Sequence, residues 1–137
     1  MAAPTPVIAI SWDGTRGLVR WYAAWTDGTQ LTDSVVVDIS TLSPAPNSVK
    51  IRRFDVLING DADVAFEFDA TTDELIDRFV GQSDVTNYND RKYDDGPSNG
   101  FTPTTTAAGF TGDIVLTTLN AANLDEVNAL IIFERNS

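Results

Sequence analysis

The chain has 137 residues, which suits a single domain spanning 1–137, since domains commonly hold roughly 100–150 residues. Its formal charge is −11, and an acidic surface of that kind repels phosphate backbones, so no nucleic-acid partner is expected. Cysteine and histidine are absent, which excludes disulfides, thiolate metal sites and the commonest general base, leaving carboxylates, lysine, tyrosine or hydroxyls for any catalysis.

The N-terminal stretch MAAPTPVIAI has neither a basic region nor a sustained apolar run, so it does not predict a signal peptide. No segment has the apolar length needed to cross a bilayer, and no membrane contact is expected. We expect residues 1–6 to form a short extended arm. Pro4 and Pro6 within this arm are candidate interface residues.

Alternation of apolar and polar residues predicts β-strands along most of the chain. In DVAFEFDA, residues 63–70, the side chains of Val64, Phe66 and Phe68 share one face and acidic side chains share the other. Residues 113–119 and 127–134 predict two further, largely buried strands. Three more apolar faces are predicted: Ile8, Ile10 and Trp12; Val19, Trp21, Ala23 and Trp25; and Val35, Val37 and Ile39.

Turn residues separate the predicted strands. Asp-Gly occurs in WDGT (12–15) and TDGT (26–29), and Asn-Gly occurs in INGDAD (58–63). These dipeptides tolerate positive φ, so each pattern predicts a tight hairpin between antiparallel neighbours. Within 49–58 the apolar phase shifts by one residue, which predicts a β-bulge near Arg52 and Arg53.

One segment, TTDELIDRFVG (71–81), predicts a short helix. Thr71 and Glu74 have the spacing of a capping box, and Gly81 stands where a helix often ends. The apolar face of this helix would consist of Leu75, Ile76, Phe79 and Val80. Residues 82–112 follow as a long polar loop, and loops of that length are usually functional.

Together these elements predict an all-β fold. About seven or eight short strands with hairpins favour an antiparallel β-sandwich, jelly-roll-like, with one short helix and a long polar loop. A closed barrel is the alternative architecture.

The most polar stretch, NYNDRKYDDGPSNG (87–100), is a candidate calcium loop. An EF-hand register laid on it puts Arg91 or Lys92 at a ligand position, so that motif fails. Solvated acidic side chains are the default interpretation, and we expect no metal and no cofactor. The alternative left open is an irregular calcium site built from Asp90, Asp94 and Asp95.

Nothing in the sequence marks a catalytic site. Paired carboxylates can hydrolyse glycosides, but most acids here alternate with core residues, as Glu67 and Asp69 do. Glycine-rich phosphate loops are absent. The densest basic cluster is Lys50, Arg52 and Arg53, which we interpret as a strand edge or solvated face rather than a phosphate site. The chain is therefore predicted to be no enzyme.

Aromatic residues suggest two kinds of role. Trp12, Trp21 and Trp25 are in phase with core residues, so core packing is predicted for them. The alternative is sugar stacking, for which Tyr22 and Trp25 are the candidates. In the polar loop, the aromatics are either anchors or interface contacts, and these candidates are Tyr88, Tyr93 and Phe101.

Two stretches, FDATTDELIDRFVGQ (68–82) and AGFTGDIVLTTLNAANLDEVNALIIFERN (108–136), resemble small virion structural proteins of tailed bacteriophages, of the capsid decoration or cement type. The shared pattern is an alternating strand, a short helix, a polar loop, then GFTGDI and an apolar strand ending in a charge. The resemblance implies a non-enzymatic protein on the outer surface of the capsid. Its implied partners are the major capsid protein and copies of itself, as trimers near symmetry axes.

A different class of function is also compatible with the sequence. The alternative is a carbohydrate- or receptor-binding β-sandwich module of a phage tail or fibre, which would need exposed aromatic side chains beside a polar groove.

Overall fold

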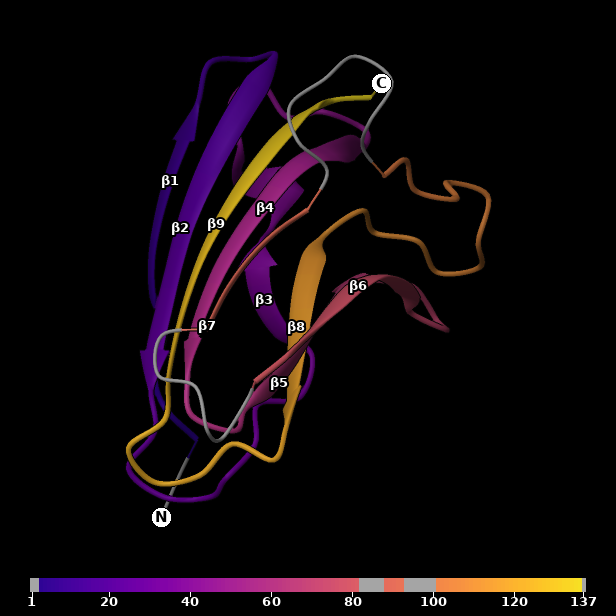
Figure 1. Cartoon of the computed structure of the whole chain (residues 1–137). Helices are drawn as coiled ribbons and strands as arrows, with labels where there is room; N and C mark the ends of the chain where they lie inside the picture. The colour runs from indigo at the N-terminus through magenta and orange to yellow at the C-terminus, as the bar shows by residue number, and fades with distance from the viewer. Residues whose placement is uncertain (1–2, 82–87, 93–100, 137) are drawn as a thin grey trace.

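The computed structural model describes residues 3–81, 88–92 and 101–136, with the side chains of 88–92 outside the described part. Within these residues, nine strands form two antiparallel sheets packed face to face (Figure 1). The wider sheet has the order β1-β2-β9-β4-β7 and the narrower one β3-β8-β5-β6. The elements are β1 (Val7–Trp12), β2 (Arg16–Ala24), β3 (Ser34–Val37), the 3₁₀ turn η1 (Ile39–Thr41), β4 (Val49–Asn59), β5 (Asp63–Phe68), β6 (Glu74–Val80), β7 (Tyr88–Lys92), β8 (Ile114–Leu119) and β9 (Glu126–Arg135). The predicted all-β antiparallel sandwich is confirmed.

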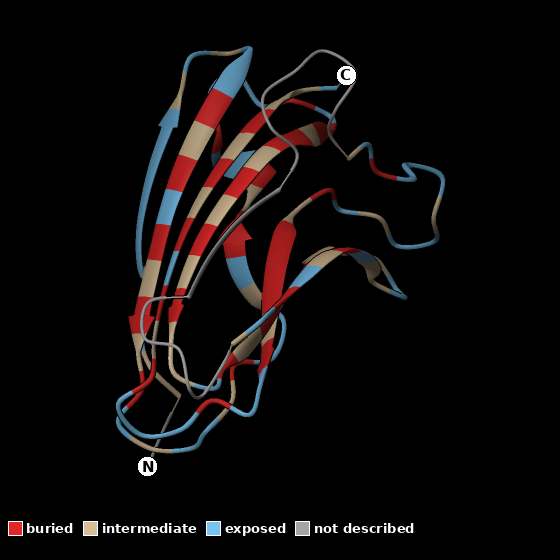
Figure 2. Cartoon of the chain, viewed as in Figure 1, coloured by how far each residue is buried: buried red, intermediate tan, exposed pale blue. Residues whose placement is uncertain are grey.

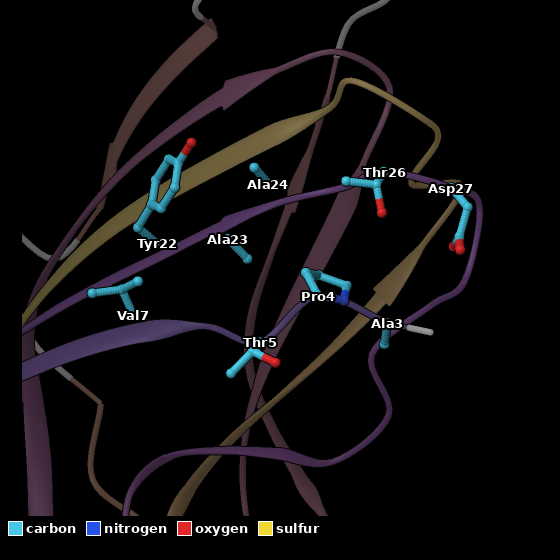
Figure 3. A pocket seen from close by; sticks show the side chains of 9 residues that line it. All are labelled: Ala3, Pro4, Thr5, Val7, Tyr22, Ala23, Ala24, Thr26 and Asp27. Atoms are coloured by element: carbon cyan, nitrogen blue, oxygen red, sulfur yellow. The ribbon is translucent and has the colours of Figure 1, made fainter. Parts of the chain in front are cut away.

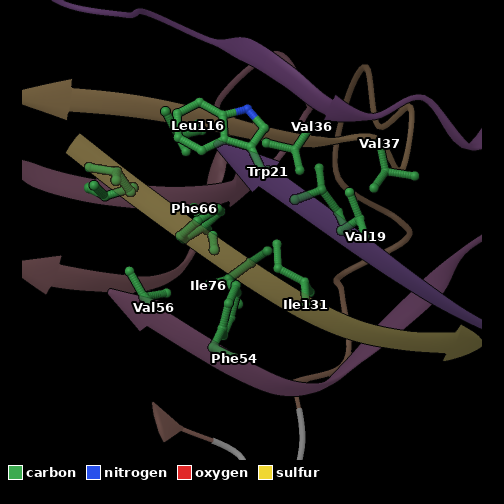
Figure 4. Close-up of a cluster of buried hydrophobic side chains, with 14 of the residues drawn as sticks. Val19, Trp21, Val36, Val37, Phe54, Val56, Phe66, Ile76, Leu116 and Ile131 are labelled. Atoms are coloured by element: carbon green, nitrogen blue, oxygen red, sulfur yellow. The ribbon is translucent and has the colours of Figure 1, made fainter. Parts of the chain in front are cut away.

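The core lies between the inner faces of the two sheets. Buried and less buried residues alternate along β2, β4, β5 and β9, as the stripes in Figure 2 show. Phe54 of the wider sheet contacts Phe66 and Phe79 of the narrower one, with ring centroids 4.8 and 5.2 Å apart. These rings and the surrounding aliphatic side chains join both sheets into one core (Figure 4).

The first predicted hairpin is confirmed. β1 and β2 pair through the turn at Asp13 and Gly14, where Gly14 has a φ of 96°. The Asp13 carboxylate accepts hydrogen bonds from the backbone N–H groups of Thr15 and Arg16, at 2.8 and 2.7 Å. These bonds, that from Arg16 first, hold the pKa of Asp13 below its ordinary value because they favour the charged carboxylate.

The predicted bulge in the 49–58 strand is also confirmed. The register of β4 against β9 shifts between Ile51 and Arg53. One extra residue on β4 therefore returns Phe54, Val56 and Ile58 to the inner face, where all three are buried.

The other two predicted hairpins are wrong. The chain at Asp27–Gly28 leads from β2 to β3, and Asn59–Gly60 leads from β4 to β5, so both connections cross between the sheets. The turn dipeptide sets the local direction of the backbone, but it does not determine which sheet the next strand joins. That choice depends on burying the inner faces of both sheets. The β8–β9 connection crosses at this same end of the sandwich (Figure 1).

Two side chains hold the crossing connections together. The Asp125 carboxylate accepts from the backbone N–H groups of Ala122 and Asp61, at 2.9 and 3.3 Å. Gly60 has a φ of 119°, and a Cβ there would overlap the Asp125 carboxylate. The Gln30 side chain joins the β2–β3 connection to the β8–β9 connection. Its amide N–H donates to the Ala121 carbonyl, and its amide oxygen accepts from the Ala121 backbone N–H.

The predicted helix over 71–81 is wrong, because residues 74–80 form strand β6 against β5. Ile76 and Phe79 are buried three residues apart, a spacing that is also helical. A register shift opposite Phe66 and Glu67 produces this spacing within a strand, since an extra residue resets the inside–outside alternation. The Glu74 carboxylate accepts from the backbone N–H and the hydroxyl of Thr104, both at 2.8 Å, instead of closing a capping box.

Two predicted core faces differ from the structure. Val35 is 47% exposed, while Val36 and Val37 are both buried, because the register of β3 also shifts between Val35 and Val37. Ile8 and Ile10 lie on the same face as the buried residues of β2, but they are 39% and 40% exposed because β1 is the outer strand of the wider sheet.

The long loop predicted over 82–112 is interrupted. Residues 88–92 form β7, which pairs with β4, and Phe101 forms an isolated bridge with Ile51. Residues 82–87 and 93–100 lie outside the described residues.

Candidate interaction surface

The predicted N-terminal arm lines an open pocket. Ala3–Pro6 precede β1 without regular secondary structure and lie beside the end of β2. The space between them has a volume of about 630 Å³ (Figure 3). Pro4 lines this pocket, and Pro6 is half-buried at the start of β1. The lining residues are Ala3, Pro4, Thr5, Val7, Tyr22, Ala23, Ala24, Thr26 and Asp27.

Tyr22 is half-buried and lines the same pocket. Its hydroxyl donates a hydrogen bond of 2.8 Å to the Glu126 carboxylate on β9. This bond, followed by partial burial and the charge of Glu126, raises the pKa of Tyr22 above its ordinary value. The ring is therefore fixed at its polar end to the neighbouring strand.

The assignment of Trp25 to sugar stacking is wrong. Trp25 is 1% exposed, and its indole N–H donates to the Thr29 carbonyl at 3.0 Å. Its side chain follows the inward phase of β2 and offers no face to a ligand. Core packing is confirmed for both Trp25 and Trp21, while Trp12 is half-buried and stacks on Phe133 with centroids 5.7 Å apart.

Phe101, a candidate interface residue, packs inward. Its backbone N–H and carbonyl both bond to Ile51 at 2.8 Å, and its ring stacks on Phe68 with centroids 6.0 Å apart. This geometry makes Phe101 an anchor for the segment after residue 100. Tyr88 begins β7 opposite Ile58, but its side chain lies outside the described part, as does the whole of Tyr93.

The basic cluster on β4 is paired with acidic side chains. Lys50 and Arg52 lie 3.1 and 3.8 Å from the Glu134 carboxylate, and Arg53 lies 3.7 Å from Asp55. Arg52 is only 8% exposed, at the bulge, so the cluster is not simply the solvated face that the sequence predicted. These contacts offset the cluster's charge within the protein and weaken any phosphate-binding interpretation.

An acidic cluster missed in the sequence lies on the narrower sheet. One carboxylate oxygen each of Asp33, Glu67 and Asp73 lies within 4.8 Å of the others. Burial, then the charges of Asp73 and Asp33, raises the pKa of Glu67. Such oxygen ligands suit a hard divalent cation, but solvated acidic groups are common without one. No sequence spacing reveals this cluster, because strand pairing brings its members together from three separate segments.

The structure does not test the irregular calcium site that the sequence left open. Asp94 and Asp95 are outside the described residues, and the side chain of Asp90 is outside them too. A further half-buried acid, Asp113, accepts from the backbone N–H of Ile39 at 3.1 Å and so ties η1 to the segment before β8. Burial, and then the charges of Asp38 and Asp69, raises the pKa of Asp113.

Large apolar side chains are exposed on two edge strands. On β1, Val7 is 67% exposed on the outer face of the sheet, while Ile8 and Ile10 are exposed on the face that bears the core; on β6, Leu75 and Val80 are 53% and 51% exposed. The outer strand β1 is exposed along nearly its whole length (Figure 2). Grouped apolar side chains on a protein surface are typical of contact sites for other proteins.

No helix in the described residues is long and apolar enough to cross a membrane. Comparison of the chain with protein-family models, with curated proteins and with solved structures finds no match.

Proposed function

We propose that the chain is a non-enzymatic virion structural protein, a capsid decoration or cement subunit of a tailed bacteriophage. It would bind the outer surface of the shell formed by the major capsid protein and stabilise the head. The observation that carries this proposal is the exposure of apolar side chains along the edge strands β1 and β6, since such surfaces suit protein partners better than small substrates. The resemblance of the second half of the sequence supplies the identity of the partner.

The strand order supports a finer description of the fold. We infer that β2-β9-β4-β7 and β3-β8-β5-β6 form the two four-stranded sheets of a jelly roll, with β1 added at one edge. Jelly rolls occur in viral capsid proteins, but also in lectins and cupins, so the fold supports the proposal only by analogy.

The hydrogen bonds between the connections that cross from one sheet to the other also suit a structural role. Asp125 and Gln30 join segments that are far apart in the sequence, which restrains one end of the sandwich without disulfides. A subunit that holds neighbouring shell proteins together against internal pressure needs this kind of stiffness.

The proposal is tested on heads that lack the protein. Purified protein is added at near-physiological salt, and we expect it to co-sediment with the heads and to raise the temperature at which they release DNA. Protein that stays in the supernatant would refute the decoration role.

Matched variants test the contribution of the apolar edge. Leu75→Lys with Val80→Lys places two charges on exposed apolar positions of β6, and Thr105→Lys with Thr106→Lys adds the same charge at exposed polar positions. If the β6 pair contacts the shell, only the first double variant loses binding. Equal binding by both would exclude this pair from the interface.

The carbohydrate-binding alternative receives less support. It needs two exposed aromatic faces, and burial of Trp25 leaves Tyr22 without the partner proposed for it. Tryptophan emission that is blue-shifted and resistant to acrylamide would agree with this burial. Strong acrylamide quenching would revive the alternative.

A further inference from the structure

The four edges of the two sheets differ in how they are protected. β3 is four residues long and has a register shift, and β6 carries Glu74, Asp77 and Arg78 as well as a shift. The sequence of β7, YNDRK, contains three charged residues. Short length, charges and bulges are the features that stop an edge strand from pairing with another chain.

The fourth edge, β1, has none of these features. Its sequence VIAISW contains no charge and no proline, and its register with β2 runs unbroken from Val7 to Trp12. One side of its backbone pairs with β2, and the other side is the outer edge of the sheet. Pro6 and Asp13 bound the uncharged stretch, so the part of the edge that can pair is well defined.

We propose that β1 pairs antiparallel with β1 of a second copy of this chain, around a two-fold axis through Ala9. Residues directly opposite each other in an antiparallel pair share one face of the sheet. Pairing around Ala9 therefore sets Ile8 of each copy against Ile10 of the other. Both isoleucines, 39% and 40% exposed in the single chain, become partners in two apolar cross-strand contacts.

The net charge of the protein favours association of two copies through β1 over association through other parts of the surface. Two copies that each carry −11 repel one another over most of their surfaces. The strand β1 is uncharged, and the residues that face Val7, Ala9 and Ser11 on β2 are Tyr22, Arg20 and Leu18, so no acidic side chain lies beside the proposed contact on that face. Centring the pair on Ile10 instead would set Asp13 opposite Val7, so Ala9 is the better centre.

The size of the contact sets its strength. Stable interfaces bury about 800 Å² on each partner, and a strand of six residues buries less than that. We therefore expect a reversible dimer with a dissociation constant in roughly the micromolar range. This inference rests on the proposed function and deepens it by assigning a two-fold contact between copies, in place of the trimer that the resemblance implies. It is tested without phage heads, so either idea can fail while the other stands.

The first test is sedimentation velocity over increasing protein concentration. We expect the mass to rise from 14.9 kDa toward twice that value. Ile8→Lys with Ile10→Lys should weaken dimerisation at least about tenfold, because charges on an edge strand block pairing. Leu75→Lys with Val80→Lys is the control, since it adds the same charge at exposed apolar positions of another edge and should dimerise normally. Circular dichroism confirms that each variant is folded.

The second test fixes the register. The chain has no cysteine, so Ala9→Cys introduces a single thiol at the proposed axis. The two Cβ atoms there would lie about 4.5–5.5 Å apart, so an approach of about 1 Å brings them into the range of roughly 3.5–4.5 Å that a disulfide needs. Mild oxidation should give a covalent dimer much faster than it does for Leu75→Cys. A protein that stays monomeric, a dimer unaffected by the two β1 lysines, or equal crosslinking of both cysteine variants would each overturn the proposal.

Discussion

Gly17 on β2 has a packing role that can be tested by substitution. Its Cα lies under the ring of Phe133, which is fully buried, and a Cβ at this position would overlap that ring. The ring of Phe133 also stacks on Trp12 at an interplanar angle of 10°. In Gly17→Ala, the ring of Phe133 therefore has to move, and its stacking on Trp12 has to change with it.

The expected loss of stability follows from two opposing effects. Overpacking a well-filled core costs typically 1–3 kcal/mol. Alanine recovers about 0.5 kcal/mol because it restricts the unfolded chain more than glycine does. We expect Gly17→Ala to lower the free energy of unfolding by about 1.5 kcal/mol, which corresponds to a fall in Tm of roughly 5 °C for a chain of this size.

Urea unfolding followed by tryptophan fluorescence measures the effect. Gly28→Ala is the control, because its Cβ would meet only the Ala121 carbonyl oxygen at 3.8 Å, an ordinary contact. Adding Phe133→Leu to Gly17→Ala should recover at least about 1 kcal/mol relative to the sum of the single variants. A Gly17→Ala protein within about 0.5 kcal/mol of the parent would refute this account of the contact.

Three further outcomes are expected. Asp125→Ala leaves the N–H groups of Asp61 and Ala122 without their carboxylate acceptor, so the free energy of unfolding measured in urea should fall by about 1–3 kcal/mol. An unchanged urea midpoint would contradict this role of Asp125. Because the pKa of Glu67 is raised in the folded state, the wild type loses stability as pH rises through that folded-state pKa. Glu67→Gln should therefore raise Tm at pH 7, and this gain should vanish as pH falls below the unfolded-state pKa. An equal gain in Tm at both pH extremes would argue against charge repulsion. Phe101→Ala removes the ring that stacks on Phe68. Hydrogen exchange at the backbone N–H of Ile51, which donates to the carbonyl of residue 101, should then accelerate by at least about tenfold. Unchanged protection of this N–H would show that the ring is not the anchor.

Alternation of side chains predicted the sandwich well where strands run without interruption. The inward faces of β2, β4 and β5 follow from their sequences, because every second side chain meets the opposite sheet. The bulge of β4 was visible because long apolar runs on both sides of it fix the phase. In β6 the register shift falls at Ile76, and Phe79 is the only other buried residue of this strand, so the two buried positions have the spacing of one helical face.

The candidate site was less predictable for a different reason. Burial of Trp25 and pairing of the cations on β4 are consistent with local patterns, whereas the clustering of Asp33, Glu67 and Asp73 depends on which strands lie side by side. Turn dipeptides gave no information on that choice, as the crossings after β2 and β4 show. Exposure of Ile8 and Ile10 likewise depends on the position of β1 at the rim of the wider sheet.

The position of β9 has a consequence for how the protein forms during synthesis. Among the residues that the structure describes, it is the last strand in sequence order, yet it separates β2 from β4 in the wider sheet. The ribosome must therefore synthesise β9 before that layer can close, and until then β2 and β4 lack the partner that separates them in the folded sheet. Pairing between such distant segments is intrinsically slow, so nascent chains would depend on protection from premature association.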